Sequence, residues 1–157
     1  MKNKLVLILH NIRSRYNVGS IFRTADGAGV DKIYLCGITP TPPHAKISKV
    51  ALGAENYVAW EKCKQTGRLV DKLKAEGYQI VALEQSKESI NYSKFSPKFP
   101  LVLILGAEVQ GLPKRILNKC EKIIEIPMRG QKKSLNVSVA CGVSLFAIIK
   151  NDQEVDR

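Results

Sequence analysis

Short runs of apolar residues recur along this chain, separated by more polar segments with helical character. Five runs, mostly rich in Val, Ile or Leu, are typical of strands buried on both faces of a parallel sheet: 5–9, 32–35, 78–83, 101–105 and 122–126. Four segments between or after them have helical spacing or helical starts: 20–28, 66–76, 113–118 and 135–150. The alternation predicts an α/β fold with a mostly parallel sheet flanked by helices.

One long connection, from residue 39 to residue 60, interrupts this alternation. It opens with Thr-Pro-Thr-Pro-Pro, and proline lacks the N–H that a regular strand ladder needs. We therefore expect a surface loop with a short helix around residues 45–52. The sequence shows no repeat, low-complexity stretch or linker, so we predict one domain over residues 1–157.

Composition narrows the class of protein. The chain has 45% hydrophobic and 25% charged residues, which is typical of a globular domain rather than a disordered segment. No run approaches the roughly 20 apolar residues that span a bilayer, and the run at 5–9 is too short for a signal-peptide core. We expect a soluble, cytoplasmic protein with no membrane partner. The four scattered cysteines form no C-x-x-C pair, so we expect reduced thiols, mostly buried, and no metal site.

Charge is the strongest compositional signal, with a formal net charge of +11. Residues 1–50 hold eight Lys or Arg residues against two Asp residues. A solvated basic surface would explain the excess, but arginines in a loop that also carries Asn and Gly favour nucleic acid as a partner.

Ligands of open α/β sheets bind beyond the carboxyl ends of the strands. That rule selects three loops: loop one (10–19), loop two (106–112) and loop three (127–134). In loop one, Asn17 is expected to cap the following helix, Gly19 permits close backbone approach, and Arg23 follows within two turns. A helix start flanked by arginines is a good phosphate site, although an ordinary cap with surface arginines explains the pattern as well.

Loops two and three carry polar groups next to buried elements. Glu108 stands between two glycines after an apolar run and is expected to orient a side chain or contact a ligand hydroxyl; a tight turn is the alternative. In loop three, Ser134 is expected to cap the last helix. Asn136 and Ser138 then place polar atoms in an apolar helix, where they need a partner such as a ligand or a second subunit.

Three segments resemble the motifs of the SpoU branch of the SPOUT methyltransferases. They are N-x-G-x-x-x-R (17–23), L-G-x-E-x-x-G-L (105–112) and I-P-M-x-G followed by S-L-N-V-S-V-A (126–140). Their order and spacing match the family over nearly the whole chain. The resemblance implies RNA ribose 2′-O-methylation with S-adenosyl-L-methionine, a homodimer, and an α/β fold whose C-terminal part forms a deep trefoil knot. Knots are nearly absent from proteins, and topology rules alone would not suggest one.

The resemblance also assigns residues. The cofactor is expected at Leu83, Gly106, Ile126, Met128 and Leu135, largely through backbone groups. Asn17, Arg23, Glu108, Ser134 and Asn136 are expected to form the catalytic set.

In the family, the arginine that matches Arg23 is assigned removal of the ribose proton. A guanidinium is normally protonated, so our hypothesis is that Arg23 holds the adjacent phosphate and stabilises the developing alkoxide.

The chain shows no accessory RNA-binding domain like those of larger relatives, so substrate selection is expected from this domain itself. We predict RNA contacts, to tRNA or rRNA, by seven basic residues: Arg13, Arg15, Lys46, Lys49, Arg129, Lys132 and Lys133. Two alternatives stay open, an inactive RNA-binding domain of the same fold and a base-methylating SPOUT enzyme.

Overall fold

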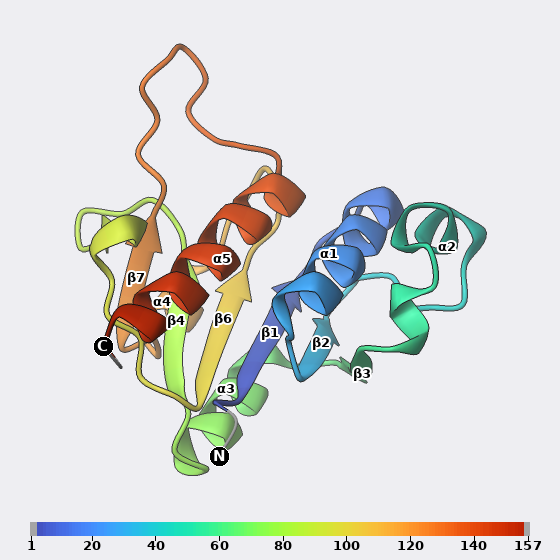
Figure 1. Ribbon diagram of the computed structural model, residues 1–157, viewed down its shortest axis with the longest axis horizontal. Helices are drawn as coiled ribbons and strands as arrows, with labels where there is room; N and C mark the ends of the chain where they lie inside the picture. Colours follow the sequence, from blue (N-terminus) through green and yellow to red (C-terminus); the bar gives the residue numbers. More distant parts are fainter. Residues whose placement is uncertain (1–2, 156–157) are drawn as a thin grey trace.

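The computed structural model describes residues 3–155, with side chains to residue 152, so the ends of the predicted 1–157 domain lie outside it. The described residues form a seven-stranded sheet in the order β3-β2-β1-β6-β4-β7-β5, in which every neighbouring pair is parallel (Figure 1). The strands are β1 (Leu5–His10), β2 (Lys32–Cys36), β3 (Ala59–Cys63), β4 (Gln79–Leu83), β5 (Ile90–Asn91), β6 (Leu101–Leu105) and β7 (Lys122–Glu125).

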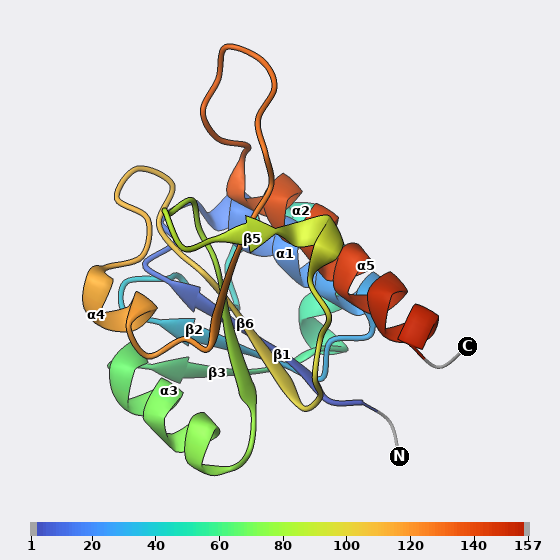
Figure 2. The same cartoon turned by 90° about the vertical axis from the view of Figure 1, so that its left-hand side faces the viewer.

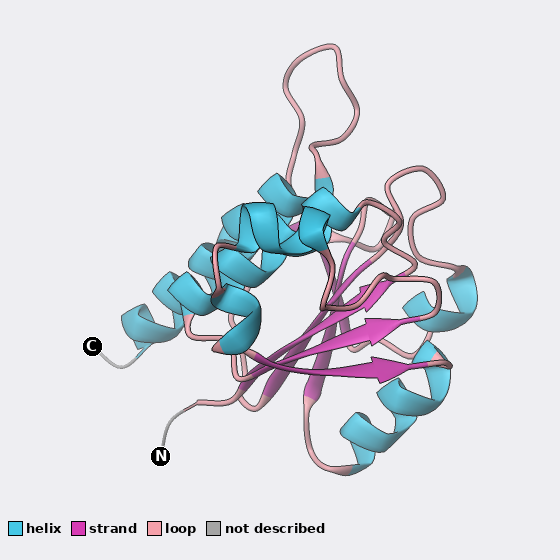
Figure 3. Cartoon of the chain, turned by 90° about the vertical axis from the view of Figure 1, so that its right-hand side faces the viewer, coloured by secondary structure: helices cyan, strands magenta, loops and turns pink. Residues whose placement is uncertain are grey.

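Helices cover both faces of this sheet, as Figures 2 and 3 show. The helices are α1 (Arg15–Ala28), α2 (Ala45–Ala51), α3 (Thr66–Ala75), α4 (Lys114–Leu117) and α5 (Val137–Val155), with 3-10 turns η1 (Ala54–Asn56) and η2 (Tyr92–Lys94). The core residues of α1, α2 and α5 pack on one face, and those of α3 and α4 pack on the other. The predicted α/β architecture is confirmed.

The two hydrophobic clusters divide the central strands residue by residue. On β1, Leu7 and Leu9 face the α1 and α5 layer, whereas Val6 and Ile8 face the α3 and α4 layer. Successive side chains of a strand point to opposite faces, so a strand covered on both sides must be apolar throughout. This is why β1 and β6 read as uninterrupted apolar runs.

The sequence pattern missed the two edge strands, β3 and β5. β3 is mostly exposed and carries Glu61 and Lys62, so it has no apolar run. Charged residues on an edge strand discourage pairing with other chains. The predicted long loop therefore runs through α2 and η1 and ends in a strand.

Two predicted helix caps are wrong. The hydroxyl of Ser14 accepts the backbone N–H of Asn17 (3.1 Å), so α1 begins at Arg15 and Asn17 lies in its first turn. The amide oxygen of Asn136 accepts the N–H of Ser138 (2.9 Å), so Asn136, not Ser134, caps α5. Both corrections free a side chain for another contact, as described below.

The parallel strands bring loops one, two and three to the same edge of the sheet. The segment between β7 and α5 projects farthest, as the orange loop above the body in Figures 1 and 2 shows. Among the described residues, no helix combines the length and apolar character that a membrane span requires.

Candidate functional site

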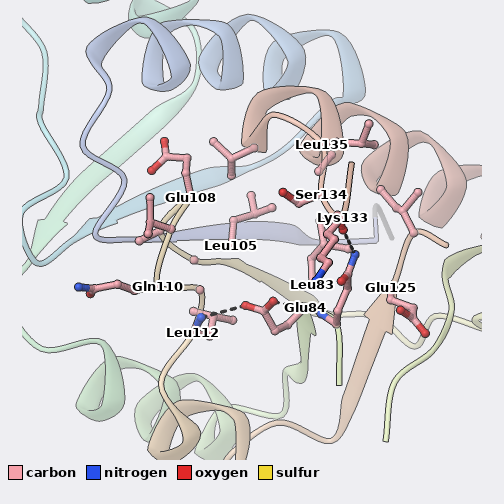
Figure 4. Close-up of a pocket in the computed structure, with 18 of the residues that line it drawn as sticks. Leu83, Glu84, Leu105, Glu108, Gln110, Leu112, Glu125, Lys133, Ser134 and Leu135 are labelled. Carbon is pink, nitrogen blue, oxygen red and sulfur yellow. Dashed lines mark hydrogen bonds between the residues drawn. The ribbon is translucent and has the colours of Figure 1, made fainter. Parts of the chain in front are cut away.

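The segments that follow β4, β6 and β7 enclose a cavity of about 470 Å³ at the carboxyl edge of the sheet (Figure 4). Small-molecule sites typically have volumes of about 300–1,000 Å³. Much of the wall is apolar and comes from Leu83, Leu105, Leu112, Leu117, Ile126, Met128, Leu135 and Val137. The cavity therefore suits a small ligand with an apolar body.

The five residues predicted to bind the cofactor all line this cavity: Leu83, Gly106, Ile126, Met128 and Leu135. They come from the ends of β4, β6 and β7 and from the approach to α5. The structure thus gathers them on one wall, although their contact with a cofactor stays a prediction.

Three of the predicted catalytic side chains form one hydrogen-bonded network. The side-chain amide of Asn17 donates to Glu108 (2.9 Å), and the amide of Asn136 donates to the side-chain oxygen of Asn17 (3.2 Å). Asn17 lies where loop one enters α1, Glu108 lies in loop two, and Asn136 lies between loop three and α5, so the network joins the ends of three loops. Because Ser14 caps α1, the Asn17 side chain is free to make these contacts. Glu108 and Ser134 also line the cavity.

Arg23 lies apart from this group. Its side chain is exposed on α1, and it is absent from the cavity wall. The described part of the chain gives the guanidinium no hydrogen bond or ion pair. The structure does not bring Arg23 to the pocket of its own chain.

The basic residues predicted to bind RNA are exposed on two surfaces. Arg13 and Arg15 flank the start of α1, and Lys46 and Lys49 lie on α2, which packs against α1. Arg129, Lys132 and Lys133 lie on the projecting loop, also exposed. Of these seven basic residues, Lys133 lines the cavity.

Four acidic or amide residues on the cavity wall were assigned no role from the sequence: Glu84, Gln85, Gln110 and Glu125. Glu84 and Gln85 directly follow β4, so the rule that selects strand ends would have found them had it been applied to that strand too. Three carboxylates line the cavity, those of Glu84, Glu108 and Glu125, together with one basic side chain, that of Lys133. An acidic pocket in a chain of net charge +11 favours a cationic ligand.

Loop one is anchored at its start by hydrogen bonds of Asn11 and of the buried His10. Asn11 has a φ of 55°, and its amide oxygen accepts the N–H of Ile38 (3.0 Å). Its amide group therefore faces Nε2 of His10 (3.3 Å), which leaves Nδ1 to donate to the hydroxyl of Thr66 (2.7 Å). Burial, and secondarily the charge of Arg115, lowers the pKa of His10 below its ordinary value of 6.5.

The four cysteines are free thiols, two of them fully buried. Burial raises the pKa of Cys141 to about 12 and that of Cys120 to about 11. Thiols that stay protonated at neutral pH are poor nucleophiles and poor metal ligands. The sequence predicted reduced thiols, mostly buried; two of the four are buried and the other two are half-buried.

Comparisons with known proteins match this geometry. The family model described as "SpoU rRNA Methylase family" matches residues 4–146. A tRNA (guanosine(18)-2′-O)-methyltransferase of Aquifex aeolicus is 35% identical over 151 residues, which are 96% of this chain and 71% of that protein. A crystal structure of an AdoMet-bound rRNA methyltransferase from Sinorhizobium meliloti superposes with a TM-score of 0.89 at 28% identity, covering 96% of this chain and 57% of that one.

Several relatives are longer than this chain. A TrmH family protein of Staphylococcus haemolyticus is 30% identical over 150 residues, and the match covers 96% of this chain but 60% of that protein. This chain therefore spans about 60% of the length of that relative.

Proposed function

Because this chain belongs to the SpoU rRNA methylase family, we propose that it is an S-adenosylmethionine-dependent RNA ribose 2′-O-methyltransferase. The observation that carries the proposal is the network of Asn17, Glu108 and Asn136, which joins three loops beside one cavity. The network links polar groups from all three family motifs, and one of them, Glu108, lines a pocket with the volume of a small-molecule site.

The cavity fits S-adenosylmethionine by size and by charge. This molecule carries a sulfonium and an ammonium group, and three carboxylates line the cavity. Apolar side chains such as Leu83, Ile126 and Leu135 would hold the adenosine part. When bound, the molecule supplies an electrophilic methyl group. The knot expected of the family would bring these loops together, and it stays a prediction.

RNA is the proposed acceptor, either tRNA or rRNA. The exposed basic residues on the projecting loop and at the start of α1 would bind its phosphates, with an affinity that falls as salt rises. Such a substrate places the protein in the cytoplasm, as part of the same proposal.

The reaction needs a ribose 2′-oxygen to attack the methyl carbon as the carbon–sulfur bond breaks. The hydroxyl proton leaves to water, and positive charge near the oxygen stabilises the alkoxide that develops. The guanidinium of Arg23 is suited to that charge and to the adjacent phosphate, because it stays protonated. It must then approach a pocket other than that of its own chain.

We further propose a homodimer in which Arg23 serves the partner's pocket. α5 exposes Val139, Val143 and Phe146, whose exposed fractions are 50%, 36% and 52%. This stripe lies beside α1, where a Cβ on Gly27 would be 4.0 Å from Phe146. A two-fold axis through the stripe would bury it on both chains and carry α1 of each chain toward the other.

Methyl transfer tests the proposed function directly. Purified protein, labelled S-adenosylmethionine and total tRNA or rRNA should yield RNA with an alkali-resistant 2′-O-methylated nucleotide. Asn136→Ala should lower the rate strongly, because it removes the link between loop three and Asn17. Methylation of a base instead of the ribose, or no binding of S-adenosylmethionine in calorimetry, would contradict the proposal.

Mixed dimers test the role of Arg23. Arg23→Ala should abolish turnover while the affinity for S-adenosylmethionine stays within about twofold of wild type, since Arg23 is absent from the cavity wall. Mixing equal amounts of Arg23→Ala and Asn136→Ala chains, each inactive alone, should restore about a quarter of wild-type activity if Arg23 acts across the dimer. No recovery after subunit exchange would place Arg23 in the site of its own chain.

A further inference from the structure

Glu84 and Gln85, the first two residues after β4, both line the cavity, and Figure 4 shows Glu84 hydrogen-bonded to Leu112. The sheet fixes their backbone, because the N–H of Glu84 donates to the carbonyl of Ile124 on β7 (3.0 Å). Side chains on such a rigid support can hold the more mobile loops around them.

Glu84 contacts loop two. One carboxylate oxygen accepts the backbone N–H of Leu112 (2.9 Å), and the other accepts the N–H of Gln85 (3.1 Å). The carboxylate is half-buried, where a hydrogen bond to a charged acceptor is stronger than one between neutral groups.

The second glycine of loop two is favoured by its backbone conformation and leaves room for this contact. Gly111 has a φ of +64°, and a Cβ there would overlap the Glu84 carboxylate. Its own N–H donates to the carbonyl of Ala107 (2.8 Å) and closes the turn that carries Glu108. Glu84 therefore fixes the base of the turn, and Glu108 at the tip of the same turn accepts the hydrogen bond from Asn17.

Gln85 contacts loop three. Its side-chain amide donates to the backbone carbonyl of Lys133, which also lines the cavity. Two adjacent residues at the end of β4 thus contact different loops: Glu84 binds loop two and Gln85 binds loop three.

We propose that Glu84 and Gln85 are positioning residues that hold loops two and three in the geometry that binds the cofactor. The proposal rests on the proposed function for the identity of the ligand. It assigns Glu84 a role through the N–H of Leu112 and not through direct pairing with a cationic ligand. Glu125 offers the matched control, since it also lines the cavity and its carboxylate makes no hydrogen bond among the described residues.

Calorimetry with S-adenosylmethionine and amide hydrogen exchange test this assignment together. Glu84→Ala should weaken binding about 10- to 100-fold and speed exchange of the Leu112 amide, because that N–H loses its acceptor. Glu84→Gln keeps one acceptor oxygen, so it should lose less than about fivefold. Gln85→Ala should speed trypsin cleavage within residues 129–133, where loop three loses its tie to β4.

The controls separate positioning from charge. Glu125→Gln removes a charge from the same cavity wall without a contact to loop two, so the exchange of the Leu112 amide should stay at the wild-type rate and the loss of affinity should be smaller than in Glu84→Gln. Equal losses in Glu84→Gln and Glu125→Gln would show that the charge of the pocket decides binding, and would overturn the proposal. So would an unchanged Leu112 amide in Glu84→Ala. If wild-type protein binds no S-adenosylmethionine, the proposed function fails, whereas hydrogen exchange still tests the hold on loop two.

Discussion

Gly19 is expected to be irreplaceable because two helices touch there. A Cβ on this residue would stand 2.5 Å from the carbonyl oxygen of Ile47, 3.2 Å from Cβ of Val50 and 3.3 Å from the N of Ala51. Because two of these atoms belong to the α2 backbone, relief requires the whole helix to move. Overpacking of this kind costs about 1–3 kcal/mol, and alanine returns about 1 kcal/mol through its helix propensity. We expect Gly19→Ala to lower the free energy of unfolding by up to about 2 kcal/mol.

Gly27 in the same helix provides the matched control. A Cβ there would meet only Phe146, at 4.0 Å, which is an ordinary contact. Gly27→Ala should therefore raise the free energy of unfolding by about 0.5–1 kcal/mol. Urea denaturation of both variants at one protein concentration would measure the difference. If Gly19→Ala is as stable as Gly27→Ala, the close approach of α2 does not explain the glycine.

Three further outcomes follow from single contacts. Because folding lowers the pKa of His10, the contribution of His10 to the free energy of unfolding is complete above pH 6.5 and is lost as the pH falls below that value. His10→Gln should therefore flatten the plot of unfolding free energy against pH in this range. An unchanged plot would exclude His10 as the source of the pH dependence. Thr39→Val should cost about 1–3 kcal/mol in urea denaturation, since the buried N–H of Ile12 loses its acceptor at 3.1 Å; a cost under about 0.5 kcal/mol would contradict this. Phe146→Ser should shift the protein from dimer to monomer in light scattering, and a stable dimer would place the interface elsewhere.

The central sheet could be predicted because burial on both faces leaves an apolar run in the sequence. β1, β4 and β6 were found for this reason, whereas β3 was not, because Glu61 and Lys62 face solvent at the edge. Strand ends then located the cavity, since parallel strands end at one edge. An apolar pattern in the sequence indicates that a segment is buried, so it does not reveal strands that are exposed to solvent.

The residues that cap α1 and α5 were predicted wrongly. Ser14 and Asn136 cap their helices, although Asn17 and Ser134 are residue types equally suited to the position. The choice depends on where the chain leaves the preceding loop. Glu84 and Gln85 also escaped, because their roles are contacts to backbone groups far along the chain, which no local pattern encodes.

The first motif, N-x-G-x-x-x-R, lies along α1, so its spacing determines the direction in which each of its residues points. At about 100° per residue, Asn17 and Arg23 are about 240° apart around α1, so they point in different directions. Asn17 reaches loop two of its own chain, Gly19 lets α2 approach, and Arg23 is exposed. A motif that looks like one ligand site in the sequence thus serves the pocket, the packing of the domain and its outer surface. If Arg23 is catalytic, that division requires a second chain, which makes the dimer part of the active site and not only a means of burying the apolar stripe on α5.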